Sequence, residues 1–158
     1  MADPEVAITV RTPLPEDMAR VVAVENRCFV DPWSWDALEQ ELASDRLRLP
    51  LVAEVDGKVV GYLMAWKIVD QLHVLNIAAD PGCRRRGVGT ALLLAAAGQA
   101  VEMGLVEVTL EVRESNSEAR AFYLRHGFIA SGLRRSYYAD NGEDAIIMTS
   151  RAAQLLSP

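Results

Sequence analysis

The sequence is poor in cysteine and aromatic residues and has no excess of basic charge. Its two cysteines, Cys28 and Cys83, cannot build a disulfide framework, so we expect both to be free thiols. Sixteen basic residues stand against 22 acidic ones, and the net charge of −6 argues against nucleic acid or an anionic membrane as the main partner. No apolar run approaches the roughly 18 residues of a membrane span, and the first residues lack the features of a signal peptide. We therefore expect a cytoplasmic protein.

The composition is otherwise that of a folded globular domain. Of the 158 residues, 51% are hydrophobic and 24% are charged, which argues against a disordered chain, a fibre or a coiled coil. A chain of this length can bury one substantial core without disulfides. No repeat or linker is visible, so we expect a single domain over residues 1–158. No spacing of His, Cys, Asp and Glu indicates a metal site.

The pattern of apolar residues and turn signals predicts alternating strands and helices. The expected strands cover residues 6–10, 51–55, 59–66, 72–79, 106–112, 128–131 and 145–149. The expected helices cover residues 16–27, a short stretch after the capping residue Ser34, and residues 90–103 and 115–126. The dipeptide Asp56-Gly57 favours a hairpin, and the nearly continuous apolar run 72–79 favours a central strand. This order predicts a mixed sheet with helices on both faces.

A basic loop containing two glycines joins the central strand to the apolar helix that follows it. The loop residues are Arg84, Arg85, Arg86, Gly87, Val88, Gly89 and Thr90. The first turn of a helix has unpaired N–H groups and a partial positive charge, and glycines let the backbone approach a pyrophosphate closely. A solvated turn would also explain the arginines, but the placement between strand and helix favours an anion site. The spacing fits neither a nucleotide-triphosphate loop nor a dinucleotide fingerprint.

The segment Arg84-x-x-Gly87-x-Gly89 resembles the Gln/Arg-x-x-Gly-x-Gly/Ala signature of the GNAT superfamily of acetyl-CoA-dependent N-acetyltransferases. The expected order of elements also matches this fold over nearly the whole chain. The resemblance implies an α/β (α+β) fold in which a mixed, mostly antiparallel sheet is flanked by helices and a central strand pair splays apart. It also implies acetyl-CoA as cosubstrate, held by the seven loop residues and by the backbone of Ile77, Ala78 and Ala79.

Three further motifs are similar to those of the bacterial RimI-type ribosomal-protein alanine N-acetyltransferases. They read Leu110-Glu111-Val112-Arg113-x-Ser115-Asn116, Ala121-Phe122-Tyr123-x-x-x-Gly127-Phe128 and Phe29-x-x-Pro32-Trp33-Ser34. The resemblance implies that Glu111 is the general base and that Tyr123 is the acid that protonates the thiolate of coenzyme A. It also implies that Asn116 contacts coenzyme A.

The residues alone leave these roles open. Leu110 and Val112 point to one face of their strand, so Glu111 points to the other, as an ordinary solvent-facing carboxylate would. Tyr123 could equally be core packing near the end of its helix, and Asn116 could cap that helix.

Several other residues are candidates for the core or for the site. His73, inside a strand, is expected to be a satisfied core residue. Trp33, Trp35, Tyr137 and Tyr138 either line a peptide groove, as the resemblance implies, or pack in the core.

The chemistry suits a protein N-terminus. Acetyl transfer needs a neutral amine, stabilisation of developing negative charge and a proton for the leaving thiolate. Roughly a tenth of an α-amine is already neutral at pH 7, and far less of a lysine amine, so one modest base suffices for the former. We expect the N-terminal alanine of a small-subunit ribosomal protein as the substrate. The alternatives are a broader N-terminal acetyltransferase, a lysine or small-molecule amine acetyltransferase, and an inactive module that binds coenzyme A.

Overall fold

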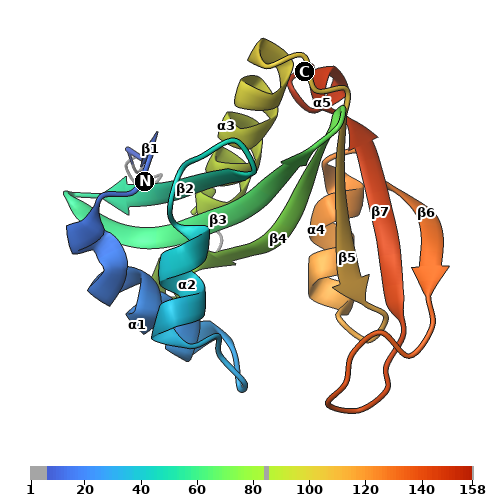
Figure 1. Cartoon of the computed structure of the whole chain (residues 1–158), viewed down its shortest axis with the longest axis horizontal. Coiled ribbons are helices and arrows are strands. Elements are labelled where there is room, and N and C mark those ends of the chain that lie inside the picture. The colour runs from blue at the N-terminus through green and yellow to red at the C-terminus, as the bar shows by residue number, and fades with distance from the viewer. Residues whose placement is uncertain (1–6, 84–85, 158) are drawn as a thin grey trace, which may run out of the picture. The chain divides into compact units, whose positions relative to one another are not determined.

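The computed structural model describes residues 7–83 and 86–157 (Figure 1). Its strands are β1 (Thr9–Arg11), β2 (Arg48–Val55), β3 (Lys58–Ile68), β4 (Gln71–Ala79), β5 (Glu107–Arg113), β6 (Ile129–Arg134) and β7 (Ala145–Arg151). Its helices are α1 (Met18–Cys28), α2 (Trp35–Glu41), α3 (Val88–Glu102), α4 (Ser117–Arg125) and α5 (Ala152–Leu155), with the 3-10 turns η1 (Pro15–Asp17) and η2 (Pro81–Cys83). Two predicted loop residues, Arg84 and Arg85, lie outside the described residues.

The described strands follow the hydrogen-bonded order β1-β2-β3-β4-β5-β7-β6, which places the apolar strand β4 in the middle, as predicted. β4 and β5 pair in parallel, whereas β1–β2, β2–β3, β5–β7 and β6–β7 pair antiparallel. The parallel ladder joins Gln71–Val74 to Glu107–Leu110 and ends there, although both strands continue.

The chain divides into two compact units. The first unit comprises Met1–Trp66 with Asn76–Ala96, and the second unit comprises Lys67–Leu75 with Ala97–Pro158. The two units are described separately below.

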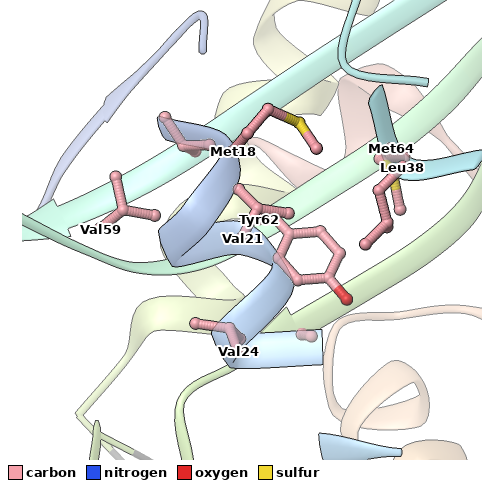
Figure 2. Close-up of a cluster of buried hydrophobic side chains, with 9 residues drawn as sticks. Met18, Val21, Val24, Leu38, Val59, Tyr62 and Met64 are labelled. Carbon is pink, nitrogen blue, oxygen red and sulfur yellow. The ribbon is translucent and has the colours of Figure 1, made fainter. Parts of the chain in front are cut away.

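In the first unit, a hairpin of β2 and β3 is covered by helices on both faces. One face carries the cluster in Figure 2, which consists of Met18, Val21, Val24, Leu38, Val52, Val59, Tyr62, Met64 and Ala78. Successive residues of a strand point to opposite faces, so Gly61 faces away from Tyr62. A Cβ at Gly61 would lie 2.7 Å from Val88 Cγ1 and 3.3 Å from Leu92 Cδ1. Helices α1 and α2 therefore pack on one face and α3 packs on the other.

In the second unit, β5 separates an apolar face from a polar one. Val108, Leu110 and Val112 alternate along β5 and are all buried, with at most 5% of each residue exposed. Leu110 lies opposite Met148 of β7, which is also buried. The intervening residues of β5 point to the other face, so Glu111 is on the polar side, as predicted.

The predicted elements are confirmed with shifts at their ends. The hairpin turn is present, since Asp56 and Gly57 both have positive φ (52° and 76°) as a tight two-residue turn requires. Ser34 caps α2, because its hydroxyl accepts a hydrogen bond from the N–H of Ala37 at 3.2 Å. α3 begins at Val88, two residues before the predicted start at Thr90. The short helix α5 and the 3-10 turns were not predicted, because a single turn leaves no periodic pattern.

Two sequence features have direct structural counterparts. Neither Cys28 nor Cys83 forms a disulfide, as predicted. In the described part of the chain, no helix combines the length and the apolar character that crossing a bilayer would need.

Candidate active site

The loop before α3 presents open backbone at the N-terminus of a long helix. Gly87 has a φ of +85°, which favours glycine, and an added Cβ would meet only Ile8 at 4.0 Å. Val88 is 2% exposed and anchors the first turn of α3 in the first unit, while Arg86 is exposed beside it. The first N–H groups of a helix have no intrahelical acceptor and lie at its positive end. The loop therefore has the donors and the space that an anion needs.

The end of β4 is fixed by contacts to α1 and β3. The carbonyl of Ala79 accepts a hydrogen bond from the Cys28 thiol at 3.2 Å. The N–H of Asp80 donates to the carbonyl of Val60 at 2.7 Å. Ala78 is buried in the core cluster, so its side chain serves packing while its backbone holds the strand end in place.

A buried carboxylate that the sequence analysis does not single out lies in the first unit. Glu25 is 1% exposed, and its two oxygens accept hydrogen bonds from the Trp33 N–H at 3.1 Å and from Asn76 Nδ2 at 3.2 Å. Burial raises the pKa of Glu25. The carboxylate thus ties the connection between α1 and α2 to β4. Glu25 lies four residues after the core residue Val21, which places it on the buried face of α1. This spacing is the feature of the sequence that could have indicated its burial.

Glu111 is held from two sides on the polar face of β5. Its Oε2 lies 2.5 Å from His73 Nε2, and its Oε1 accepts a hydrogen bond from Arg134 Nε at 3.1 Å. The side chain is only 11% exposed. It is therefore an oriented, partly buried carboxylate rather than a freely solvated one.

His73 has a hydrogen-bond partner, as predicted, but the expectation that it is a core residue is wrong, because its side chain is 21% exposed and its partner is Glu111 of the candidate site. The parallel ladder pairs His73 with Thr109, two residues before Glu111 and on the same face of β5. The sequence carried no signal for this contact, because a lone histidine in a strand does not reveal which strand pairs with it or in what register.

The two partners of Glu111 determine its protonation. The hydrogen bond from His73 is the largest cause lowering the pKa of Glu111, and the charges of His73 and Arg134 lower it further, against the raising effect of burial. Glu111 is therefore ionised at neutral pH and can accept a proton through either oxygen.

Tyr123 lies in an apolar setting in the second unit. It is 6% exposed, and its ring makes edge contacts with Phe122 and Phe128 at centroid distances of 5.2 and 5.4 Å. Burial raises the pKa of Tyr123, and Tyr138 contributes to the same shift. The core-packing role is therefore present, and the phenol is also fully protonated at neutral pH, as a proton donor needs to be.

Asn116 is the N-cap of α4. Its Oδ1 accepts a hydrogen bond from the Ala119 N–H at 3.1 Å, and the helix begins at Ser117 rather than at the predicted Ser115. The capping role is thereby confirmed, whatever else this side chain contacts.

The aromatic residues with two readings divide between surface and partly buried positions. Trp33, Trp35 and Tyr137 are exposed by 37%, 48% and 48%, so the core-packing alternative does not hold for these three. Tyr138 is partly buried against Arg113.

The predicted site residues fall into two groups along the chain. The loop residues and Ile77 to Ala79 belong to the first unit, whereas Glu111, Tyr123 and Asn116 belong to the second. Among the residues that the structure describes, no three His, Cys, Asp or Glu side chains gather in a way that could hold a metal ion.

Comparison with known proteins gives one consistent result. Residues 18–128 match the acetyltransferase (GNAT) family. Over 134 residues the chain is 34% identical to the [ribosomal protein bS18]-alanine N-acetyltransferase of Escherichia coli (strain K12), a match that covers 84% of this chain and 89% of that protein. It is 45% identical over 112 residues to the N-alpha-acetyltransferase of Sulfurisphaera tokodaii, covering 63% of this chain and 66% of that one.

The fold is likewise similar to a solved structure. The crystal structure of the ribosomal-protein-S18-alanine N-acetyltransferase from Escherichia coli superimposes with a TM-score of 0.83 at 31% identity. The superposition covers 92% of this chain and 94% of that one.

Proposed function

The chain belongs to the acetyltransferase (GNAT) family, and on this premise we propose that it acetylates the N-terminal α-amine of a protein, with the alanine terminus of ribosomal protein bS18 as substrate. Members of this family take the acetyl group from acetyl-CoA. The observation that carries the proposal is the ionised Glu111, oriented by His73 and Arg134 on the polar face of β5. The family match over residues 18–128 spans segments of both units, which supports one domain over residues 1–158.

The residues present suit acetyl-CoA, which supplies the acetyl group as a thioester. We assign the pyrophosphate to residues 84–90, because Gly87 leaves open space at the N-terminus of α3 and a helix start attracts anions. The pantetheine arm is assigned to the backbone of residues 77–79. The ladder between β4 and β5 ends at Val74, which leaves backbone groups further along β4 for hydrogen bonds to the amides of the arm.

Glu111 serves as the general base in this proposal. An α-amine has an ordinary pKa near 7.7–8.0, so a fraction of the substrate amines is already neutral at pH 7. The carboxylate has to deprotonate only the amines that are still charged, or to take the proton that the amine releases as it attacks. His73 keeps the carboxylate ionised and oriented through the contact between Nε2 and Oε2.

Tyr123 serves as the acid that protonates the leaving thiolate. Its phenol stays protonated because burial raises its pKa. Asn116 is assigned a contact to coenzyme A in addition to its cap.

Kinetics of isosteric variants test these roles. Glu111→Gln is expected to lower kcat by about a hundredfold or more while leaving the KM for acetyl-CoA nearly unchanged. Glu107→Gln is the matched control, since Glu107 lies on the same face of β5 and accepts a hydrogen bond from Gln71 Nε2 at 3.0 Å. Equal kcat values for the two variants would remove Glu111 from the mechanism. Tyr123→Phe with full turnover and an unchanged pH profile would remove Tyr123.

A broader N-terminal acetyltransferase is the second candidate. The identity of 45% to the archaeal N-alpha-acetyltransferase favours it. Peptides that begin with Ala, Ser or Met and share the rest of their sequence separate the two. Activity confined to the bS18 terminus supports the first candidate, and comparable activity on all three supports the second.

A further inference from the structure

One side chain of β5 organises the connection between β6 and β7, residues 135–144. Arg113 is the last residue of β5, and its guanidinium pairs with both carboxylate oxygens of Asp140 at 3.1 and 2.9 Å. Its Nη1 also donates to Glu143 Oε1 at 3.3 Å and to Asn141 Oδ1 at 3.4 Å. A single cation therefore gathers three side chains from the second half of this connection.

The same guanidinium holds an aromatic ring. Cζ of Arg113 lies 3.9 Å from the centroid of the Tyr138 ring, a distance typical of a cation–π contact. The backbone of Tyr138 closes a turn, because its N–H donates to the carbonyl of Glu143 at 3.1 Å and its carbonyl accepts from the N–H of Gly142 at 2.8 Å. The carboxylate of Glu143 accepts from the Ser115 N–H at 2.7 Å, which ties this turn to the chain just after β5.

This organised connection adjoins the proposed base. Arg113 and Glu111 are two residues apart on β5 and therefore point to the same face. Burial is the main cause that raises the pKa of Tyr138, the charge of Arg113 lowers it, and the charge of Glu111 adds to the rise. Arg134, which bonds to Glu111, lies 5.8 Å from the ring of Tyr137.

We propose that Arg113 is a positioning residue for the acceptor peptide. It holds residues 137–144 in one conformation, so that Tyr137, next to Arg134 and thereby close to Glu111, is in place before the substrate arrives. The inference rests on the proposed function. A connection without this anchor would have to be ordered by the peptide on binding, and that ordering lowers affinity. Only arginine meets the requirement, because lysine supplies the charge but neither the bidentate fork nor the stacked plane.

Arg113→Lys tests the proposal with the charge retained. We expect the KM for the acceptor peptide to rise about tenfold, the equivalent of one bidentate contact. The kcat at saturating peptide and the KM for acetyl-CoA are expected to stay within about twofold of wild type, because the reacting groups are untouched. Arg125→Lys, on the exposed last turn of α4, is the matched control and is expected to behave as wild type.

A second variant changes the other partner of the Arg113–Asp140 pair. Asp140→Asn removes the bidentate partner and is expected to raise the peptide KM in the same way. The double variant is expected to show less than the sum of the two effects, because both act through one contact. If Arg113→Lys fails to fold, as judged by circular dichroism, Asp140→Asn decides the question by itself.

The outcomes separate a positioning role from a structural one. If Arg113 serves the fold alone, Arg113→Lys and Asp140→Asn lower the melting temperature but leave the peptide KM unchanged, and the inference is overturned. A raised peptide KM with an unchanged acetyl-CoA KM supports it. Failure of the proposed function looks different, because the wild-type protein would then acetylate no peptide at all.

Discussion

A methyl group added at Gly61 would force apart the elements that build the anion loop. The new Cβ would lie 2.7 Å from Val88 Cγ1, 2.9 Å from the carbonyl oxygen of Ala78 and 3.3 Å from Leu92 Cδ1. The Val88 side chain could rotate, but the Ala78 oxygen belongs to the backbone, so β4 or the start of α3 has to move. We therefore predict that Gly61→Ala destabilises the protein and weakens acetyl-CoA binding.

The size of the effect follows from two opposing contributions. Overpacking a core typically costs about 1–3 kcal/mol, whereas replacing glycine stabilises by about 0.4–1 kcal/mol through the unfolded chain. The net loss of unfolding free energy is about 1–2 kcal/mol. Since 1 kcal/mol corresponds to about 2–4 °C for a protein of this length, the melting temperature is expected to fall by about 2–8 °C.

A second glycine supplies the control. Gly98 lies within α3, and an added Cβ there would meet no atom within 4 Å. Alanine is favoured over glycine inside a helix by about 1 kcal/mol, so Gly98→Ala should melt above wild type. Thermal melts followed by circular dichroism and the KM for acetyl-CoA give both readouts. The reasoning is refuted if Gly61→Ala melts at or above wild type, or if the two variants shift in the same direction.

Three further predictions concern single polar side chains. His73→Leu removes the largest cause that lowers the pKa of Glu111, so the acid limb of kcat/KM should move to higher pH, and an unmoved limb in the pH–rate profile would contradict this assignment. Burial raises the pKa of Glu25 in the folded state, so the native protein binds more protons than the unfolded chain just above the ordinary glutamate value. The unfolding free energy should therefore fall as pH rises through that window, and Glu25→Gln should lose this dependence in denaturant titrations. Asn116→Ala should lower the free energy of unfolding by about 1 kcal/mol, because the helix cap is lost. If the KM for acetyl-CoA also rises, Asn116 contacts coenzyme A as proposed. If that KM is unchanged, capping is the sole role of Asn116.

Local signals were enough to predict most of the fold. The Asp56-Gly57 turn and the Ser34 cap depend on neighbouring residues, and both are present as predicted. The start of α3 was predicted two residues late, because Val88 and Gly89 were assigned to the loop although Val88 is a buried helical residue.

Contacts between distant segments could not be predicted in the same way. His73 and Glu111 meet because β4 and β5 pair in parallel with a particular register, and no local pattern encodes a register. The hydrogen bonds from Arg113 to Asp140 and Glu143 depend on how the ten-residue connection 135–144 folds back onto the end of β5. The composition of this connection alone does not reveal its conformation. The face of Glu111 followed from simple alternation, whereas the identity of its partners required the structure.

The central claim is that this chain places an acetyl group on a protein N-terminus. The most direct measurement is to incubate the protein with acetyl-CoA and a peptide that carries the alanine terminus of bS18 and an internal lysine, and to locate the acetyl group by fragment mass spectrometry. We predict a single acetyl group on the α-amine of the alanine, and a far smaller yield of this product in the same time when the Glu111→Gln variant replaces the wild-type protein. Acetylation of the lysine side chain, or of neither nitrogen despite measurable binding of acetyl-CoA, would contradict the account.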